Sequence, residues 1–100
     1  MQIQLLYFPG CPGWQTTAEH LEALAGHLGF SWETVAVAPE DDAAHLGFRG
    51  SPTILVNGMD PFATDDQPFA FACRVYRTPD GFAASPTREQ LRLAIEAADS

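Results

Sequence analysis

The chain opens with an apolar run that a proline and a glycine end abruptly. Residues Ile3 to Phe8 are strand formers with Gln4 as the one polar member, and Pro9-Gly10 follows. Such a run is typical of a strand buried on both faces, which needs other elements packed against each side. From Trp14 to Leu28, apolar residues then recur at helical spacing. A strand that leads into a helix predicts a β-α unit, and a parallel pairing with the strand that comes next.

The rest of the chain alternates between strand and helix patterns. In order, we expect a strand at 31–37, a short helix from Pro39 to about Leu46, strands at 53–56 and 73–77, a returning strand at 82–84, and a last helix capped by Ser85 or Thr87. This order predicts an α/β fold with a central mixed sheet of four or five strands, flanked by three helices.

The stretch from about residue 59 to 81 departs from this alternation. It holds prolines and aspartates, and it also carries Phe62, Phe69 and Phe71. A disordered linker would not carry three phenylalanines, so we expect a packed insertion that ends in the turn around Pro79. The length of 100 residues predicts one domain, and the insertion belongs to it.

Charge and composition exclude several classes of partner. The net charge is −8, from thirteen acidic residues and five arginines, and there is no lysine. Such a surface repels nucleic acid and anionic lipid, and the apolar runs are too short to span a membrane. The first residues lack the pattern of a secretory signal, and two cysteines are too few for a disulfide scaffold. We therefore expect a cytoplasmic protein with neither nucleic acid nor membrane as a partner.

Cys11 stands where the first strand turns into the first helix, and Pro12, Gly13 and Trp14 follow it. Unpaired backbone N–H groups and the helix dipole stabilise a thiolate at such a position, so we expect a reactive cysteine with a lowered pKa. The alternative is a small buried cysteine that merely ends a strand. Trp14 either covers the thiol or only begins the apolar stripe of the helix.

The segment Ser51-Pro52-Thr53 leads into the expected third strand. With Cys11-Pro12 at the start of the first helix and the β-α-β order between them, it resembles the thioredoxin-like superfamily. The resemblance covers Ile3 to Gly58 and again Phe82 to Ala98. It implies a thioredoxin-like fold in which Pro52 is cis and lies against the thiol of Cys11.

The resemblance also implies that Pro12, Trp14, Ser51 and Pro52 contact the substrate. The chain departs from the dithiol pattern, because Trp14 stands in place of the second cysteine and Leu5 in place of a buried acid. A thiol exchange cycle would then need a second thiol from elsewhere. Cys73 is the one other cysteine, and it is either that thiol or a buried strand residue.

The position of Cys73 depends on the path of the insertion. If residues 73–77 pair at once as the fourth strand, Cys73 lies at the end of the sheet far from Cys11. If residues 59–72 first carry the chain back across the domain, Cys73 lies near Cys11. The phenylalanines before Cys73 and the turn at 78–81 favour the second path, so we expect the two cysteines to be close.

A second resemblance is to the thioredoxin-like core of alkylmercury lyase. Cys11 and Cys73 look like its pair of cysteines, although Trp14 stands where that enzyme has its catalytic aspartate. The leading interpretation is a small thioredoxin-like protein with one reactive cysteine, which carries out thiol redox or thiol-adduct chemistry with a thiol-containing protein or a small thiol. The alternatives are two-thiol binding of a soft metal, organomercurial-lyase-like activity, and a non-catalytic scaffold that self-associates as a homodimer.

No cofactor is expected, and no metal site beyond the two thiols. His20, His27 and His45 lack the spacing of metal ligands, and the acidic run 40–42 is more simply explained as the start of a helix.

Overall fold

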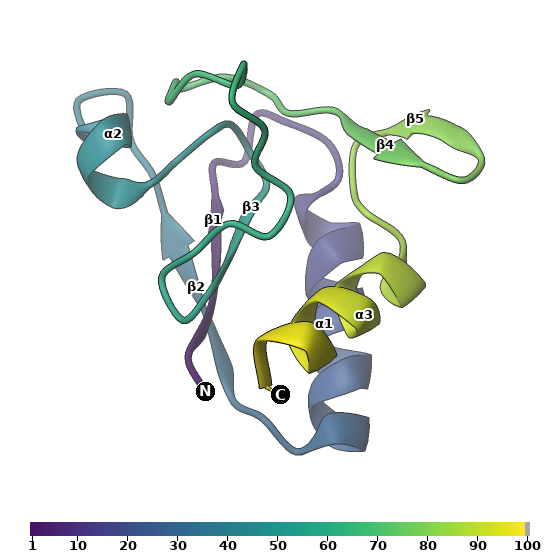
Figure 1. The fold of residues 1–100 in the computed structure, drawn as a ribbon. Coiled ribbons are helices and arrows are strands. Elements are labelled where there is room, and N and C mark those ends of the chain that lie inside the picture. Colours follow the sequence, from purple (N-terminus) through teal and green to yellow (C-terminus); the bar gives the residue numbers. More distant parts are fainter. Residues whose placement is uncertain (100) are drawn as a thin grey trace.

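A computed structural model describes residues 1–99 of the chain. The elements are β1 (Ile3–Tyr7), α1 (Trp14–Leu28), β2 (Trp32–Ala36), α2 (Ala43–Leu46), β3 (Thr53–Val56), β4 (Tyr76–Thr78), β5 (Gly81–Ala83) and α3 (Arg88–Asp99). The expected order of strands and helices is confirmed, and the fold is mixed α/β with three helices (Figure 1). None of these helices has the length and apolar character needed to cross a lipid bilayer.

Strand β1 forms the middle of the main sheet. It pairs in parallel with β2, with Leu5 opposite Thr34, and antiparallel with β3, with Leu5 opposite Ile54. The strand order is therefore β2-β1-β3. The parallel pair confirms the prediction from the β-α-β pattern, because α1 carries the chain back between β1 and β2.

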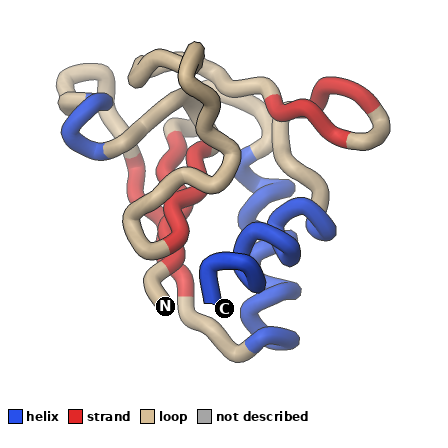
Figure 2. Tube along the Cα trace, in the orientation of Figure 1, coloured by secondary structure: helices blue, strands red, loops and turns tan. Residues whose placement is uncertain are grey.

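The prediction of one sheet with four or five strands is wrong. Within the described residues 1–99, strands β4 and β5 pair only with each other, in a two-stranded sheet apart from the main one (Figure 2). The long loop after β3 returns the chain to the start of β3, where the backbone of Cys73 forms an isolated parallel β-bridge with Ser51. From there the chain does not follow the length of β3, and the β4–β5 hairpin projects beyond the sheet.

The two faces of β1 are both buried, as predicted. On one face Leu5 packs under α1 and α3, and on the other Leu6 packs with Phe48 near α2. The larger cluster consists of Ile3, Leu5, Leu21, Leu24, Ile54, Val56, Tyr76, Leu91 and Ile95. Alternation along the strand thus divides the core into two parts that hold the sheet from both sides.

The buried face of α1 differs from the expected stripe. It is made by Thr17, Leu21 and Leu24, whereas Leu28 is exposed. Thr17 can be buried because its hydroxyl donates to the carbonyl oxygen of Gly13 and shares a hydrogen bond of 2.7 Å with the hydroxyl of Ser85. This polar pair ties the start of α1 to the segment that leads into α3.

The helix caps agree only in part with the predictions. Thr87 caps α3, and its hydroxyl and the side chain of Gln90 each accept from the other's backbone N–H, as the capping box requires. The second helix is shorter than expected and begins at Ala43. Its cap is Asp42, whose carboxylate accepts from the N–H of His45.

Candidate functional site

The structure joins Cys11 and Cys73 in a disulfide. The two residues are 62 positions apart in the chain and their Cα atoms lie 5.5 Å apart, so the prediction that they are close is confirmed. Their surroundings differ. Cys11 is 3% exposed, whereas Cys73 is exposed. The disulfide therefore joins a buried residue to a residue at the surface.

The insertion packs against the domain through its aromatic side chains. Phe71 stacks on Phe8, with ring centroids 4.0 Å apart, and Phe62 meets the ring of Tyr76 at 5.5 Å. Phe69 lies beneath a guanidinium group. Through these contacts residues 59–72 pack against the domain, and they lead the chain back to the position where Cys73 bonds to Cys11.

Ser51 connects the two segments that carry the cysteines. Its hydroxyl oxygen accepts from the N–H of Phe8 at 3.1 Å, near the end of the strand that precedes Cys11. Its backbone N–H donates to the carbonyl of Ala72 at 2.8 Å, and its own carbonyl accepts from the N–H of Arg74 at 3.0 Å. Both neighbours of Cys73 are thereby held, and this fully buried serine aligns the disulfide.

The peptide bond between Ser51 and Pro52 is cis, as predicted. Because Ser51 bonds to both sides of Cys73, this loop lies beside the disulfide. The preceding Gly50 has a φ of 108°, and a Cβ atom there would lie only 3.0 Å from Cβ of Arg74 and 3.1 Å from the carbonyl oxygen of Ala72. A glycine at this position lets the Cys73 segment approach the loop closely.

A buried ion pair lies under the same segment. The guanidinium of Arg74 donates to the carboxylate of Asp60 at 2.6 Å, and the side chains are 2% and 0% exposed. Arg74 also donates to Thr53 and Gln67, and Arg49 lies 4.0 Å from the same carboxylate. One acid thus balances two arginines and fixes the insertion to the start of β3.

Sequence reasoning did not identify this pair. Asp60 has no spacing that distinguishes it from Asp65 and Asp66, and Arg74 follows a cysteine in a pattern that reads as an ordinary strand. The sequence offers one weak indication of such a pair. It has only five arginines for thirteen acidic residues, so each arginine has many possible acidic partners.

The buried side chain of Tyr76 contacts the cis-proline loop through a hydrogen bond. It is 4% exposed, and its hydroxyl donates to the carbonyl oxygen of Pro52. Burial raises the pKa of the Tyr76 phenol well above its usual value of 10.0, against the opposing effect of the nearby Arg74. The phenol therefore stays neutral and keeps donating through the alkaline range.

Replacing Tyr76 with phenylalanine should lower the free energy of unfolding by about 1–2 kcal/mol near neutral pH, because the buried carbonyl of Pro52 loses its donor. The variant should also be less sensitive to alkali. The unfolded wild-type chain releases the phenol proton near pH 10 and the folded chain retains it, so wild-type stability falls as the pH rises above 10. Urea unfolding from pH 8 to 11 measures both effects. If the free energy of unfolding falls equally steeply with pH above 10 in the two proteins, the raised pKa of Tyr76 is contradicted.

Trp14 and Pro12 border the buried cysteine along the chain. The ring of Trp14 stacks on Tyr7 of β1, with centroids 4.3 Å apart, and Pro12 is exposed. The stacking holds the indole against the sheet. Whether Trp14 shields the thiol, and whether Cys11 has a lowered pKa once reduced, stay predictions.

A pocket of about 470 Å³ adjoins Pro12. The start of α1 and the β4–β5 hairpin with the segment after it form its two sides, and Gly13 and His20 are among the lining residues. Burial lowers the pKa of His20 below its usual 6.5, and the charge of Arg88 lowers it further. The His20 imidazole in the α1 side of the pocket is therefore neutral at pH 7.

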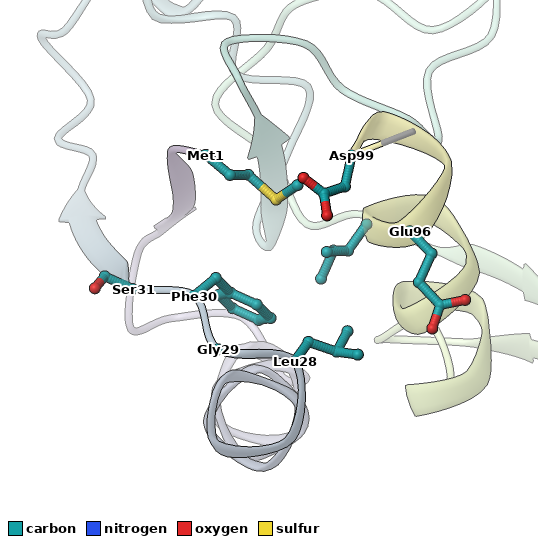
Figure 3. Close-up of a pocket in the computed structure, with 8 residues that line it drawn as sticks. Met1, Leu28, Gly29, Phe30, Ser31, Glu96 and Asp99 are labelled. Carbon is teal, nitrogen blue, oxygen red and sulfur yellow. The ribbon is translucent and has the colours of Figure 1, made fainter.

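Another pocket, of about 410 Å³, lies at the other end of β1 and α1 (Figure 3). Leu28, Phe30 and Met1 line it together with the carboxylates of Glu96 and Asp99. It contains neither cysteine, and it is not part of the candidate site.

The site offers two sulfurs and few other ligands. Within residues 1–99, no three side chains of the metal-ligating types come close enough together to hold an ion. Comparisons with protein families, with curated proteins and with solved structures find no match for this chain. Its chemistry must therefore be inferred from the disulfide and its surroundings.

Proposed function

We propose that this protein is a thioredoxin-like thiol–disulfide exchange protein that uses Cys11 and Cys73 as its redox pair. The observation that carries the proposal is the asymmetric burial of the disulfide, with an exposed Cys73 bonded to a buried Cys11. The parallel β1–β2 pair, the antiparallel β3 and the cis Pro52 support the resemblance to the thioredoxin-like superfamily. The partner is a thiol-containing protein or a small thiol.

The different burial of the two cysteines determines which sulfur the partner attacks and which sulfur leaves. A partner thiolate attacks the sulfur of Cys73, the new bond joins the partner to Cys73, and the Cys11 sulfur leaves as a thiolate with the electron pair of the broken bond. A second partner thiolate then attacks the partner's sulfur in this mixed disulfide and releases Cys73. The partner leaves oxidised as a disulfide, and the protein holds two thiols, which take up the protons that the partner thiols lost.

The surroundings of Cys11 suit a leaving thiolate. It lies two residues before Gly13, the residue that caps α1, so the unpaired N–H groups of the first helical turn are near. The bonds from Ser51 to both neighbours of Cys73 do not depend on the disulfide. They can keep the two sulfurs close after reduction, so that the disulfide can form again.

The decisive experiment is to equilibrate the folded protein with mixtures of reduced and oxidised glutathione and to follow the disulfide by intact mass after alkylation. We expect reversible reduction without denaturant. Cys11→Ser should form a mixed disulfide with glutathione at Cys73 as the share of oxidised glutathione rises, because no second protein thiol is present to replace the adduct with an internal disulfide. Cys73→Ser is the matched control and should react more slowly, since Cys11 is buried. A disulfide that is reduced only when the protein is unfolded would be structural, and would overturn the proposal.

The closeness of the two sulfurs also favours a second function, in which reduced Cys11 and Cys73 bind a soft metal ion such as Hg²⁺. The test is titration of the reduced protein with Hg²⁺ under a competing small thiol. Binding of one ion that is lost in both single cysteine variants supports this function. Binding no tighter than that of the single variants excludes it. Carbon–mercury cleavage would also need a proton donor in place of Trp14.

A further inference from the structure

The backbone beside Cys73 has an open edge that could accept another strand. In the bridge to Ser51, the groups that bond are the carbonyl of Ala72 and the N–H of Arg74. Along an extended chain the backbone groups of successive residues point to opposite sides, so those of Cys73 and Val75 point away from Ser51. Within residues 1–99, these N–H and C=O groups of Cys73 and Val75 have no hydrogen-bond partner.

Apolar side chains flank the exposed cysteine on the same segment. Phe71 and Val75 stand two residues to either side of Cys73, and they are 38% and 59% exposed. The intervening Arg74 is buried in its ion pair. The segment therefore has an open backbone edge at the disulfide-bonded Cys73, with a partly exposed apolar side chain two residues to either side.

Resting on the proposed function, we infer that the exchange partner is an extended, cysteine-bearing polypeptide that pairs as a strand with the Cys73–Val75 edge. A backbone edge is complemented by another backbone, which a small thiol does not have. Pairing gives hydrogen bonds to Cys73 and Val75 and places the partner's cysteine beside the disulfide. Apolar residues next to that cysteine then contact Phe71 and Val75.

The charge of the chain narrows the class of polypeptide further. The protein carries −8, which repels acidic segments and attracts basic ones over the range of a Debye length. The partner segment is therefore apolar around its cysteine and basic beyond it.

The test compares rates of disulfide exchange with the oxidised wild-type protein. The probes are a seven-residue peptide with valines flanking a central cysteine and lysines at its ends, the same peptide with N-methyl groups on the two residues next to the cysteine, and N-acetylcysteine amide. We expect the first peptide to react at least about tenfold faster than the other two, because N-methylation removes the backbone donors next to the cysteine and the small thiol has no flanking residues to pair along the edge. A peptide with glutamates at its ends should react more slowly than the lysine peptide.

A pair of charge-matched variants locates the contact. Val75→Asp should slow the lysine–valine peptide severalfold and leave N-acetylcysteine amide unchanged. Leu93→Asp, at a residue of α3 that is 54% exposed, adds the same charge and should change neither rate. Equal rates for the peptide, its N-methylated form and the small thiol would overturn the strand-pairing inference while the proposed exchange function stands. No exchange with any probe would remove both.

Discussion

Replacing Asp60 with asparagine is expected to lower the free energy of unfolding of the oxidised protein by about 3–5 kcal/mol. The change removes the negative charge from a carboxylate that is 0% exposed and leaves the guanidinium of Arg74 buried without a counter-ion. Arg49, 4.0 Å from the same carboxylate, loses its counter-ion as well. Denaturant unfolding of the wild type and the variant gives the difference directly.

Asp65→Asn is the matched control, because Asp65 lies in the same insertion and is exposed. It should change stability by less than about 0.5 kcal/mol. A double variant, Asp60→Leu with Arg74→Met, removes both charges and should recover much of the loss, since well-packed apolar residues can replace a buried ion pair. If Asp60→Asn costs no more than Asp65→Asn, the ion pair does not hold the insertion in place.

Reducing the disulfide is expected to lower the free energy of unfolding by about 4 kcal/mol, because the bond between Cys11 and Cys73 closes a loop of 62 residues and restricts the unfolded chain. The reduced protein should nevertheless remain folded. The hydrogen bonds of Ser51 and the ion pair of Arg74 still hold the Cys73 segment against the domain. Unfolding curves with and without reductant measure the difference.

The double variant Cys11→Ser with Cys73→Ser controls for effects of the reductant itself. Its stability should match that of the reduced wild type to within about 1 kcal/mol and should not respond to reductant. Identical midpoints for the oxidised and reduced wild type would contradict the expected stabilisation. Complete unfolding on reduction would instead contradict a role in reversible exchange, because the two thiols would no longer be held together.

Local patterns in the sequence were enough to predict most elements of secondary structure. The strand at Ile3–Tyr7, the helix that begins at Trp14 and the strand at Thr53–Val56 each follow from a run of residues that bury the same face or faces. The capping box of Thr87 with Gln90 is equally local, since it spans three residues. Their prediction needed no knowledge of distant parts of the chain.

Tertiary contacts decided the rest, and the candidate site belongs mostly to this part. The sequence placed Cys11 at a strand-to-helix turn and left two paths open for Cys73. The path was decided by contacts between distant residues, such as Phe71 on Phe8 and Arg74 on Asp60. The hairpin β4–β5 lies outside the main sheet for the same reason. The segment that returns after β3 pairs through Cys73 with Ser51, in the loop before β3, and not along β3 itself.

By itself, then, the sequence determined the order of strands and helices but not all of their bounds, since the strand expected at 73–77 is β4 at Tyr76–Thr78. Only the tertiary structure decided that Cys73 is the exposed cysteine and Cys11 the buried one, and that Ser51 holds both of their segments. The physical reason is that periodicity reports burial on a face of one element. The exposure of a cysteine and the partner of a buried charge depend on which distant segments cover them.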